Sequence, residues 1–271
     1  ADDSQLYVSY NLNSVEEKAN AISKIENCIQ NIKSWMTSNK LKLNDDETEV
    51  LQVSSAWQKP KSDNLKLTIG THSVSSSTNV KNLGALFDAH LKMDSQVKAT
   101  CRNAYCHLRN IGKIRKYLTV EATKRVTHAF ISSRLDQNNS LLYGLPKSQI
   151  QKLQRVQNSA ARIITHTKKT ESISPHLIDL HWLPVKQRID FKMLTLTYKC
   201  LNNLGPSYLT ELLLPYKPCR SLRSSSSLLL QVPKSKLKNY GDRAFAVAAP
   251  KLWNSLPADI RSSTSLESFK A

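Results

Sequence analysis

The sequence predicts an α+β protein, in which a small antiparallel sheet with one packed helix precedes a mostly α-helical remainder. Short alternating segments separated by polar turns occupy the first part of the chain, as half-buried strands do. Beyond Lys92, apolar residues recur instead at steps of three and four, the pattern of amphipathic helices. With 271 residues, 40% of them hydrophobic, the chain is long enough to build sizeable cores.

A strand and a long helix are expected at the start of the chain. Leu6, Val8 and Tyr10 alternate with polar or smaller positions and predict a half-buried strand. Ser14 and Glu17 then have the spacing of a capping box, in which the serine accepts from first-turn N–H groups and the glutamate reaches back. The helix that begins here should pack one apolar face on a sheet. This face consists of Ala19, Ile22, Ile25, Ile29, Ile32 and Trp35 or Met36.

Three short strands should follow the helix. They are predicted at "EVLQVSS" around Val50, at "LKLTIG" (residues 65–70) and at "VKNLGALFD" (residues 80–88), with polar, turn-rich stretches between them. Three sequential short strands indicate an antiparallel meander.

Four helices are predicted after the sheet. The first two cover about residues 95–117 and 120–133, and the third follows Pro146. The fourth begins at Pro184, because proline suits the first turn of a helix, and it ends at "NNLGP", where glycine and proline interrupt it.

The C-terminal part combines a polar segment with a small apolar patch. Residues 217–239 are basic and Ser-rich with too few apolar residues for a core, so this segment should wrap the surface or be mobile. Residues 245–253 should form a short helical cap. Trp182 and Trp253 have apolar neighbours and are expected in the core rather than stacked on a base.

Several classes of function are disfavoured by the composition. The chain has only 6 glycines and neither a G-x-G-x-x-G nor a G-x-x-x-x-G-K motif, which argues against Rossmann and P-loop nucleotide sites. Its 5 cysteines are scattered without a C-x-x-C, so neither a disulfide framework nor a zinc site is indicated. No apolar run is long enough to span a bilayer, and no signal peptide is visible. We therefore expect a soluble, intracellular protein without a membrane partner.

The net charge of +18 is unevenly distributed: residues 1–50 carry a net −4 and the remaining residues a net +22. Such a positive field attracts polyanions. The density is greatest between residues 96 and 130, where eight cations accompany a single acid, Glu121. These cations can be read as a solvated helix face or, in view of the overall charge, as contacts to a nucleic-acid backbone. They are Lys98, Arg102, Arg109, Lys113, Arg115, Lys116, Lys124 and Arg125.

Several segments, taken in order, resemble one known family, the reverse transcriptases of LINE-type non-long-terminal-repeat retrotransposons. "ADD" at residues 1–3 and the strand after it resemble the turn and second half of the catalytic palm hairpin. "WMTSNKLKLNDDETEVL" resembles the next palm motif, and "VKNLGALFD" resembles the primer-grip hairpin. "HAFISSRLD", "LQRVQNSAARII", "LHWLPVKQRIDFK", "GDRAFAVAAPKLWNSLP" and "IRSSTSLESFK" resemble thumb and C-terminal segments in the order of the family.

The resemblance spans essentially the whole chain and implies three regions. Residues 1–92 would be a partial palm, residues 93–172 a helical thumb-like region, and residues 173–271 a helical C-terminal region that contains the basic loop near 217–239. It implies an RNA-directed DNA polymerase whose partners are an RNA template and a DNA primer, or an RNA–DNA duplex, in the nucleus or cytoplasm. The oligomeric state stays open.

The resemblance also implies the chemistry of the site. Polymerases join nucleotides through two Mg²⁺ ions held by carboxylates. Asp2 would be the primary metal ligand and Asp3 the supporting acid; the alternative is an Asp pair that merely ends a strand. The fingers and the first metal-binding palm motif have no counterpart in this sequence. We therefore expect the chain alone to bind Mg²⁺ weakly, to need the missing N-terminal part of the polymerase as a partner, and to extend no primer.

Two further positions are singled out by the resemblance. Where the family has a lysine before the Thr–Glu pair, this chain has Glu47, which would add repulsion near a departing pyrophosphate or would simply be a solvated turn residue. Leu83 and Gly84 would lie at the primer grip, since glycine lets the backbone approach a strand; the alternative is a bulged turn.

Two functions therefore stay open. The first is a C-terminal fragment of a retrotransposon polymerase that is incomplete for polymerisation by itself. The second is a non-enzymatic, basic nucleic-acid-binding or interaction protein derived from a retrotransposon. Both hypotheses predict backbone binding, and they differ only on chemistry.

Overall fold

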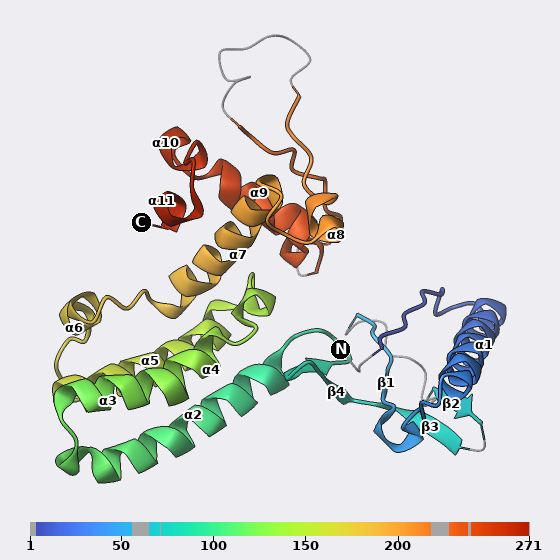
Figure 1. Ribbon diagram of the computed structural model, residues 1–271, viewed down its shortest axis with the longest axis horizontal. Helices are drawn as coiled ribbons and strands as arrows, with labels where there is room; N and C mark the ends of the chain where they lie inside the picture. The colour runs from blue at the N-terminus through green and yellow to red at the C-terminus, as the bar shows by residue number, and fades with distance from the viewer. Residues whose placement is uncertain (1–3, 56–64, 71, 218–227, 238–239, 271) are drawn as a thin grey trace. The chain divides into compact units, whose positions relative to one another are not determined.

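The structure, a computed structural model, describes residues 4–55, 65–70, 72–217, 228–237 and 240–270. It shows an α+β protein that divides into two compact units, Ala1–Gln96 and Val97–Ala271 (Figure 1). The first unit contains all of the strands defined in the described residues, and the second unit is helical. We describe each unit by itself.

The first unit begins its regular structure with the helix α1 (Val15–Ser38), as predicted. The hydroxyl of Ser14 accepts from the N–H of Glu17 at 3.2 Å and caps the helix. The carboxylate of Glu17 accepts from Asn11 (2.9 Å) and not from Ser14, whose N–H already donates to the carbonyl of Asn11. The predicted helix start is therefore confirmed, but the second half of the capping box is formed with a different residue. At the far end of the predicted apolar face, Trp35 is 62% exposed.

The three-stranded sheet has the order β1-β3-β2, with β1 (Val50–Leu51), β2 (Lys66–Ile69) and β3 (His72–Ser77). β2 pairs antiparallel with β3, and β1 pairs parallel with β3, so the predicted meander is wrong. The prediction missed β3 because its sequence, "HSVSSS", has one apolar residue and gives no hydrophobic alternation. α1 packs on β2, whose Leu67 and Ile69 are buried.

The segment 80–88 is a hairpin rather than the single strand that its periodicity suggested. β4 (Asn79–Asn82) and β5 (Ala85–Asp88) pair antiparallel. Leu83 (φ 45°) and Gly84 (φ 82°) connect them in a two-residue turn with both φ angles positive, as in a type I′ turn. A hairpin is what the family resemblance implies at this position; its role as a primer grip stays a prediction.

The strand predicted at residues 6–10 is not formed. This stretch is irregular and pairs with no strand among the described residues, and a strand is defined by its ladder. Side chains make the contacts instead. The hydroxyl of Tyr10 accepts from Gln52 Nε2 (2.6 Å), and Gln5 Oε1 accepts from Asn82 Nδ2 (3.1 Å).

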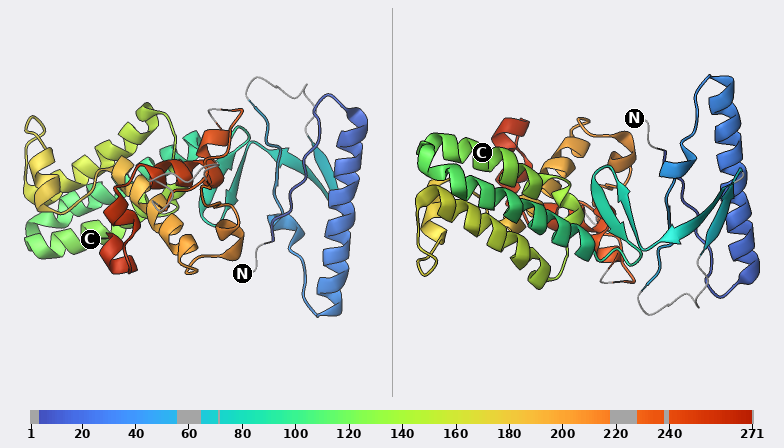
Figure 2. Two further views of the ribbon diagram at one scale, coloured as in Figure 1. Left: turned by 90° about the horizontal axis from the view of Figure 1, so that it is seen from above. Right: turned by 90° about the horizontal axis from the view of Figure 1, so that it is seen from below.

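The second unit is built around long helices that run side by side (Figures 1 and 2). α2 (Asp94–Ile114) continues into the short η2 (Arg115–Tyr117), as predicted for residues 95–117. The helix predicted at 120–133 is also confirmed. It consists of α3 (Val120–Thr127), the π-helical turn η3 (His128–Ser132) and α4 (Ser133–Asp136), and η4 (Asn139–Leu142) follows it.

The third and fourth predicted helices are confirmed as α5 (Lys147–Thr165) and α7 (Val185–Leu201). Between them lies α6 (Ser174–Asp179), which the sequence did not indicate because it is less than two turns long. α5 packs against α3, α6 and α7, so it is the central helix of this part of the unit.

The C-terminal helices close a second core. They are α8 (Ser207–Thr210), η6 (Gly241–Arg243), α9 (Phe245–Asn254), α10 (Ala258–Arg261) and α11 (Leu266–Lys270). Trp253 is 2% exposed and stacks on Phe269 (5.8 Å between ring centroids), which stacks on Tyr198 of α7 (4.5 Å). The predicted core position of Trp253 is thus confirmed.

The expectation that residues 217–239 contribute nothing to a core is wrong for Leu230, which is buried in this cluster. Leu230 pairs with Pro215, and its backbone is held in both directions by the side-chain amide of Asn254. Residues 218–227 and 238–239 lie outside the described residues.

Candidate nucleic-acid interface

One surface of α2 carries four exposed cations. We call it the α2 cationic face, and its members are Lys98, Arg102, Arg109 and Lys113. At 3.6 residues per turn these positions fall within about 60° around the helix axis and span roughly 22 Å along it. The acidic residue of this helix, Asp94, lies in its first turn. Four of the eight predicted backbone contacts therefore share one surface.

The orientation of α2 follows from its buried residues. Val97, Ala104, Leu108 and Ile111 are each at most 4% exposed. Their mean direction lies about 140° from that of the α2 cationic face, at 100° of rotation per residue. Burial of this stripe against the rest of the unit thus turns the α2 cationic face outward.

One ring contact joins α2 to a neighbouring helical turn. The ring of His107 stacks on Phe130 of η3 with centroids 5.1 Å apart. Burial raises the pKa of the Cys101 thiol, and the nearby ammonium of Lys152 on α5 opposes that shift in part. Cys101 is therefore partly buried, about 90° around the axis of α2 from the centre of the α2 cationic face.

The charge of the chain resides in the second unit. Residues 97–271 carry 29 Lys and Arg against nine Asp and Glu, a net +20, whereas residues 1–96 are slightly negative. A surface cation in this unit is thus surrounded by others, and the field at the α2 cationic face is positive over its length.

Arg115 differs from the other predicted cations. Its side chain is partly buried, and its Nε and Nη2 atoms have no hydrogen-bond partner among the described residues. A guanidinium in this position is poorly placed to meet a phosphate in solution. The structure thus separates Arg115 from the α2 cationic face, although it lies only two residues beyond Lys113.

The remaining three cations are exposed but lie elsewhere. Lys116 of η2 places its Nζ 4.8 Å from the ring centroid of the neighbouring Tyr117. Lys124 and Arg125 of α3 lie 3.9 and 3.7 Å from the carboxylate of Glu121 and line a shallow hollow with residues 179–182. Exposed pairs of this kind contribute little to stability. Trp182 lines the same hollow and also packs on Ile173 and Leu177, so its predicted core position is confirmed only in part.

Sequence reasoning missed Tyr105 as part of this surface. It lies three residues after Arg102 and four before Arg109, so it is a neighbour of both on the helix. Its side chain is 43% exposed. The i+3 and i+4 spacing to the two arginines is visible in the sequence, but an aromatic residue in a helix is more often part of the core.

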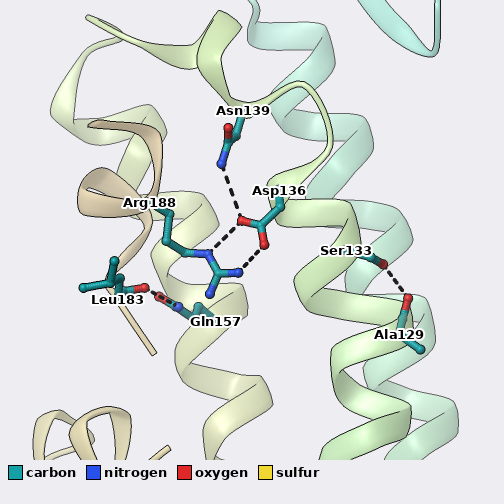
Figure 3. Close-up of polar contacts among 7 residues, drawn as sticks. All are labelled: Ala129, Ser133, Asp136, Asn139, Gln157, Leu183 and Arg188. Atoms are coloured by element: carbon teal, nitrogen blue, oxygen red, sulfur yellow. Dashed lines mark hydrogen bonds and ion pairs between the residues drawn. The ribbon is translucent and has the colours of Figure 1, made fainter. Parts of the chain in front are cut away.

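Polar side chains join helices of the second unit (Figure 3). Arg188 of α7 donates from Nε to Asp136 Oδ1 at 2.7 Å and from Nη2 to Oδ2, which makes a bidentate ion pair. Asn139 donates to the same carboxylate. The pair joins the segment "HAFISSRLD" to the segment "LHWLPVKQRIDFK", which are 52 residues apart at these positions.

Glutamines of α5 complete the network. Gln157, which is 1% exposed, donates to the carbonyl of Leu183 at 2.8 Å (Figure 3), and Gln154 accepts from the N–H of Val185 at 2.9 Å. These bonds fix the chain at the start of α7, whose first N–H groups have no partner within the helix. Three of the segments that resemble the retrotransposon family thus meet through their polar side chains.

The residues predicted to bind metal cannot be placed. Asp2 and Asp3 lie outside the described residues. Within the described part of the chain, no three His, Cys, Asp or Glu side chains are grouped so that they could hold a metal ion. Two carboxylates of residues 45–49 have partners: Asp45 accepts from Lys33 Nζ at 2.8 Å through one of its oxygens, and Glu49 accepts from the N–H of Lys81.

Glu47 and the primer-grip residues are exposed. Glu47 ends the short helical turn η1 (Asp45–Glu47). Leu83, which is 73% exposed, and Gly84 form the tip of the β4–β5 hairpin. All three belong to the first unit, whereas the α2 cationic face belongs to the second.

Comparison of the chain with protein-family models, with curated proteins and with solved structures gives no match. None of the described helices is both long and apolar enough to cross a membrane. The fold and the surface together define an α+β protein whose helical unit carries a large positive charge and one well-aligned row of cations.

Proposed function

We propose that this chain binds the phosphate backbone of nucleic acid through the α2 cationic face, without reading the base sequence. The observation that carries the proposal is the arrangement of α2: four exposed cations lie on one side and the buried stripe on the other. Phosphate contacts from Lys and Arg position a protein on nucleic acid but carry no sequence information.

The dimensions of the surface support this function. Phosphates follow one another at about 3.4 Å along a strand of B-DNA, so a row of roughly 22 Å faces about six nucleotide steps. Spacings of four and seven residues place the cations at intervals of about 6 and 10 Å, which a flexible Lys or Arg side chain can adjust to individual phosphates. The net charge of the second unit adds long-range attraction.

The resemblance to LINE-type reverse transcriptases extends the proposal. In that reading the second unit is the thumb and C-terminal region of an RNA-directed DNA polymerase, the bound nucleic acid is a template–primer duplex, and Asp2 and Asp3 are the Mg²⁺ ligands of the complete enzyme. Three resembling segments are joined in sequence, two by the Asp136–Arg188 pair and the third by the bonds of Gln154 and Gln157 to the start of α7, which supports the idea that they belong to one structural unit. The other candidate is a binding protein without catalytic activity.

Salt dependence of binding tests the backbone contacts. Each neutralised phosphate contributes about −0.9 to the slope of log K against log salt for a duplex, so four contacts predict about −3.6. If all eight predicted cations engaged, the slope would be nearer −7. Because Arg115 is partly buried and Lys124 and Arg125 belong to another helix, we expect the smaller value.

The decisive variant replaces Lys98, Arg102, Arg109 and Lys113 by Gln. In this variant the slope of log K against log salt should become less negative by about 3.6, and the affinity at 0.1 M salt should fall by up to three orders of magnitude. Both are measured by fluorescence anisotropy with a labelled duplex two turns long. A matched control replaces the exposed residues Lys147, Arg155, Lys169 and Lys192 by Gln, which removes the same charge from the second unit. If the two variants lose slope equally, binding is diffuse and the α2 cationic face is not the interface.

Primer extension separates the two candidate functions. With Mg²⁺ and deoxynucleotides, the purified chain should extend no primer on an RNA template, because the resemblance assigns it only part of the catalytic site. Extension that is abolished by Asp2→Asn would show that these residues suffice for polymerisation. A longer chain that gains activity only with intact Asp2 would favour the polymerase over the non-enzymatic binder.

A further inference from the structure

The α2 cationic face is not purely electrostatic, because aromatic rings accompany its cations. Tyr105 lies between Arg102 and Arg109 on the same side of α2, with 43% of its surface exposed. Tyr117 lies beyond the end of α2 and is 77% exposed, with the ammonium of Lys116 4.8 Å from its ring centroid. One exposed ring, that of Tyr105, thus lies within the α2 cationic face. A second, that of Tyr117, lies beyond its C-terminal end and is turned about 70–130° around the axis from the centre of that face.

Exposed rings among cations are the features that bind unpaired nucleotides. Every base has a flat aromatic surface that can stack on a tyrosine side chain, whereas the bases of a duplex are already stacked on one another. Cations beside the rings neutralise the phosphates that connect the stacked bases. A duplex could use the cations of this surface, but it could not use the rings without unstacking its bases.

The ring of Tyr117 is held for such a contact. The Lys116 ammonium near its centroid gives a cation–π interaction, which limits the orientations of the ring. Tyr105 is restrained in a different way, because it lies within the helix α2 with the long side chains of Arg102 and Arg109 on either side. Both rings are too exposed to form part of a core, so a ligand can reach them.

We infer that this surface and the end of its helix select single-stranded nucleic acid, with one base stacked on Tyr105, another on Tyr117, and the intervening phosphates on Arg109 and Lys113. The inference rests on the proposed function and specifies its ligand. Counting 1.5 Å per residue along α2 and 2.0 Å along η2, the two tyrosines are roughly 20 Å apart along the axis. At 3.4 Å per stacked nucleotide, about six nucleotides cover that distance, and fewer would do so if the strand is extended.

The test uses the full chain and two labelled probes, an oligothymidylate about twice as long as that six-nucleotide span and a blunt duplex of the same length. Tyr105→Ala and Tyr117→Ala should each weaken binding of the single strand roughly 5- to 150-fold, the range measured for loss of one base–aromatic stack. Duplex affinity should change less than twofold, and the salt slope for the single strand should stay the same, because no cation is removed. Tyr105→Phe and Tyr117→Phe, which keep the ring, should restore single-strand affinity.

A control and a second readout guard against effects on folding. Tyr208→Ala removes from α8 a ring whose exposure (66%) lies between those of Tyr105 and Tyr117, and it should leave both affinities unchanged. Photo-crosslinking with a 5-iododeoxyuridine strand should attach to Tyr105 and Tyr117, as found by mass spectrometry of the digested chain.

The outcomes distinguish this inference from the proposed function. If both alanine variants bind the single strand as the wild type does, or if they weaken single strand and duplex equally, the inference is wrong while the backbone function stands. If the salt slope is the same for the wild type and for the variant in which Lys98, Arg102, Arg109 and Lys113 are replaced by Gln, the proposed function fails as well.

Discussion

The ion pair between Asp136 and Arg188 gives a prediction about how the helical unit is held together. Replacing Arg188 by Met keeps most of the side-chain volume. Among the described residues, it leaves the Asp136 carboxylate with only the long hydrogen bond from Asn139. The Arg188 side chain is 18% exposed and that of Asp136 40%, so the pair lies between a surface pair and a buried one. Breaking a fully buried pair costs about 3–5 kcal/mol and an exposed one less than about 1 kcal/mol.

We therefore expect Arg188→Met to lower the free energy of unfolding by about 2 kcal/mol. For a unit of this size that corresponds to a fall in Tm of roughly 4–8 °C, followed by circular dichroism at 222 nm. Lys192→Met is the matched control, because it removes the same charge from an exposed position on the same helix. A Tm for Arg188→Met within 1 °C of that control would refute the claim that this pair joins α4 to α7.

Three further changes probe individual positions. Leu83→Asn should stabilise the hairpin by about 1 kcal/mol in urea unfolding, because asparagine tolerates the positive φ at which leucine is strained, and Leu83→Ala should not. Arg115→Met should raise the unfolding free energy by about 1–3 kcal/mol, because it removes buried donors that lack partners among the described residues. The nucleic-acid affinity should stay almost unchanged. A large loss of affinity would show that Arg115 belongs to the interface. Burial raises the pKa of Asp190 above its usual 3.8, so folding disfavours the charged form of this carboxyl. The wild type therefore loses stability as pH rises from the pKa of Asp190 in the unfolded chain to its higher pKa in the folded chain. Asp190→Asn should match the wild type below about pH 3.8 and be more stable at pH 7; equal stability at pH 7 would contradict this sign.

The sequence predicted the elements whose signal is local. The four long helices and the cap at Ser14 follow from periodicity and capping chemistry, which involve residues within one or two turns of each other. For these features the physical cause lies within a short stretch of chain.

The features that the sequence did not predict depend on distant partners. β3 is a strand because β1 and β2 pair with it, although its own side chains are mostly serine. Leu230 is buried because Asn254, 24 residues away, holds its backbone next to the C-terminal core. Gln157 is fully buried because the carbonyl of Leu183 accepts its amide proton. No periodicity marks such residues.

The candidate site was predicted in part for the same reason. Eight cations were named from charge density alone, and density does not say which side chains share a surface. Burial of α2 selects four of them and sets Arg115 apart. The spacing of Tyr105 to Arg102 and Arg109 is visible in the sequence, but its exposure depends on which side of α2 is covered and became visible only with the fold.

Lysine footprinting tests the central claim most directly, because it locates the bound nucleic acid on the protein. The chain is acetylated with a limiting reagent, free and saturated with oligonucleotide, and the rate at each lysine is measured by mass spectrometry. We predict that Lys98 and Lys113 are protected several-fold, whereas Lys147, Lys169 and Lys192 react at unchanged rates. Equal acetylation of Lys98 and Lys113 in the free and the saturated chain would show that α2 does not carry the interface.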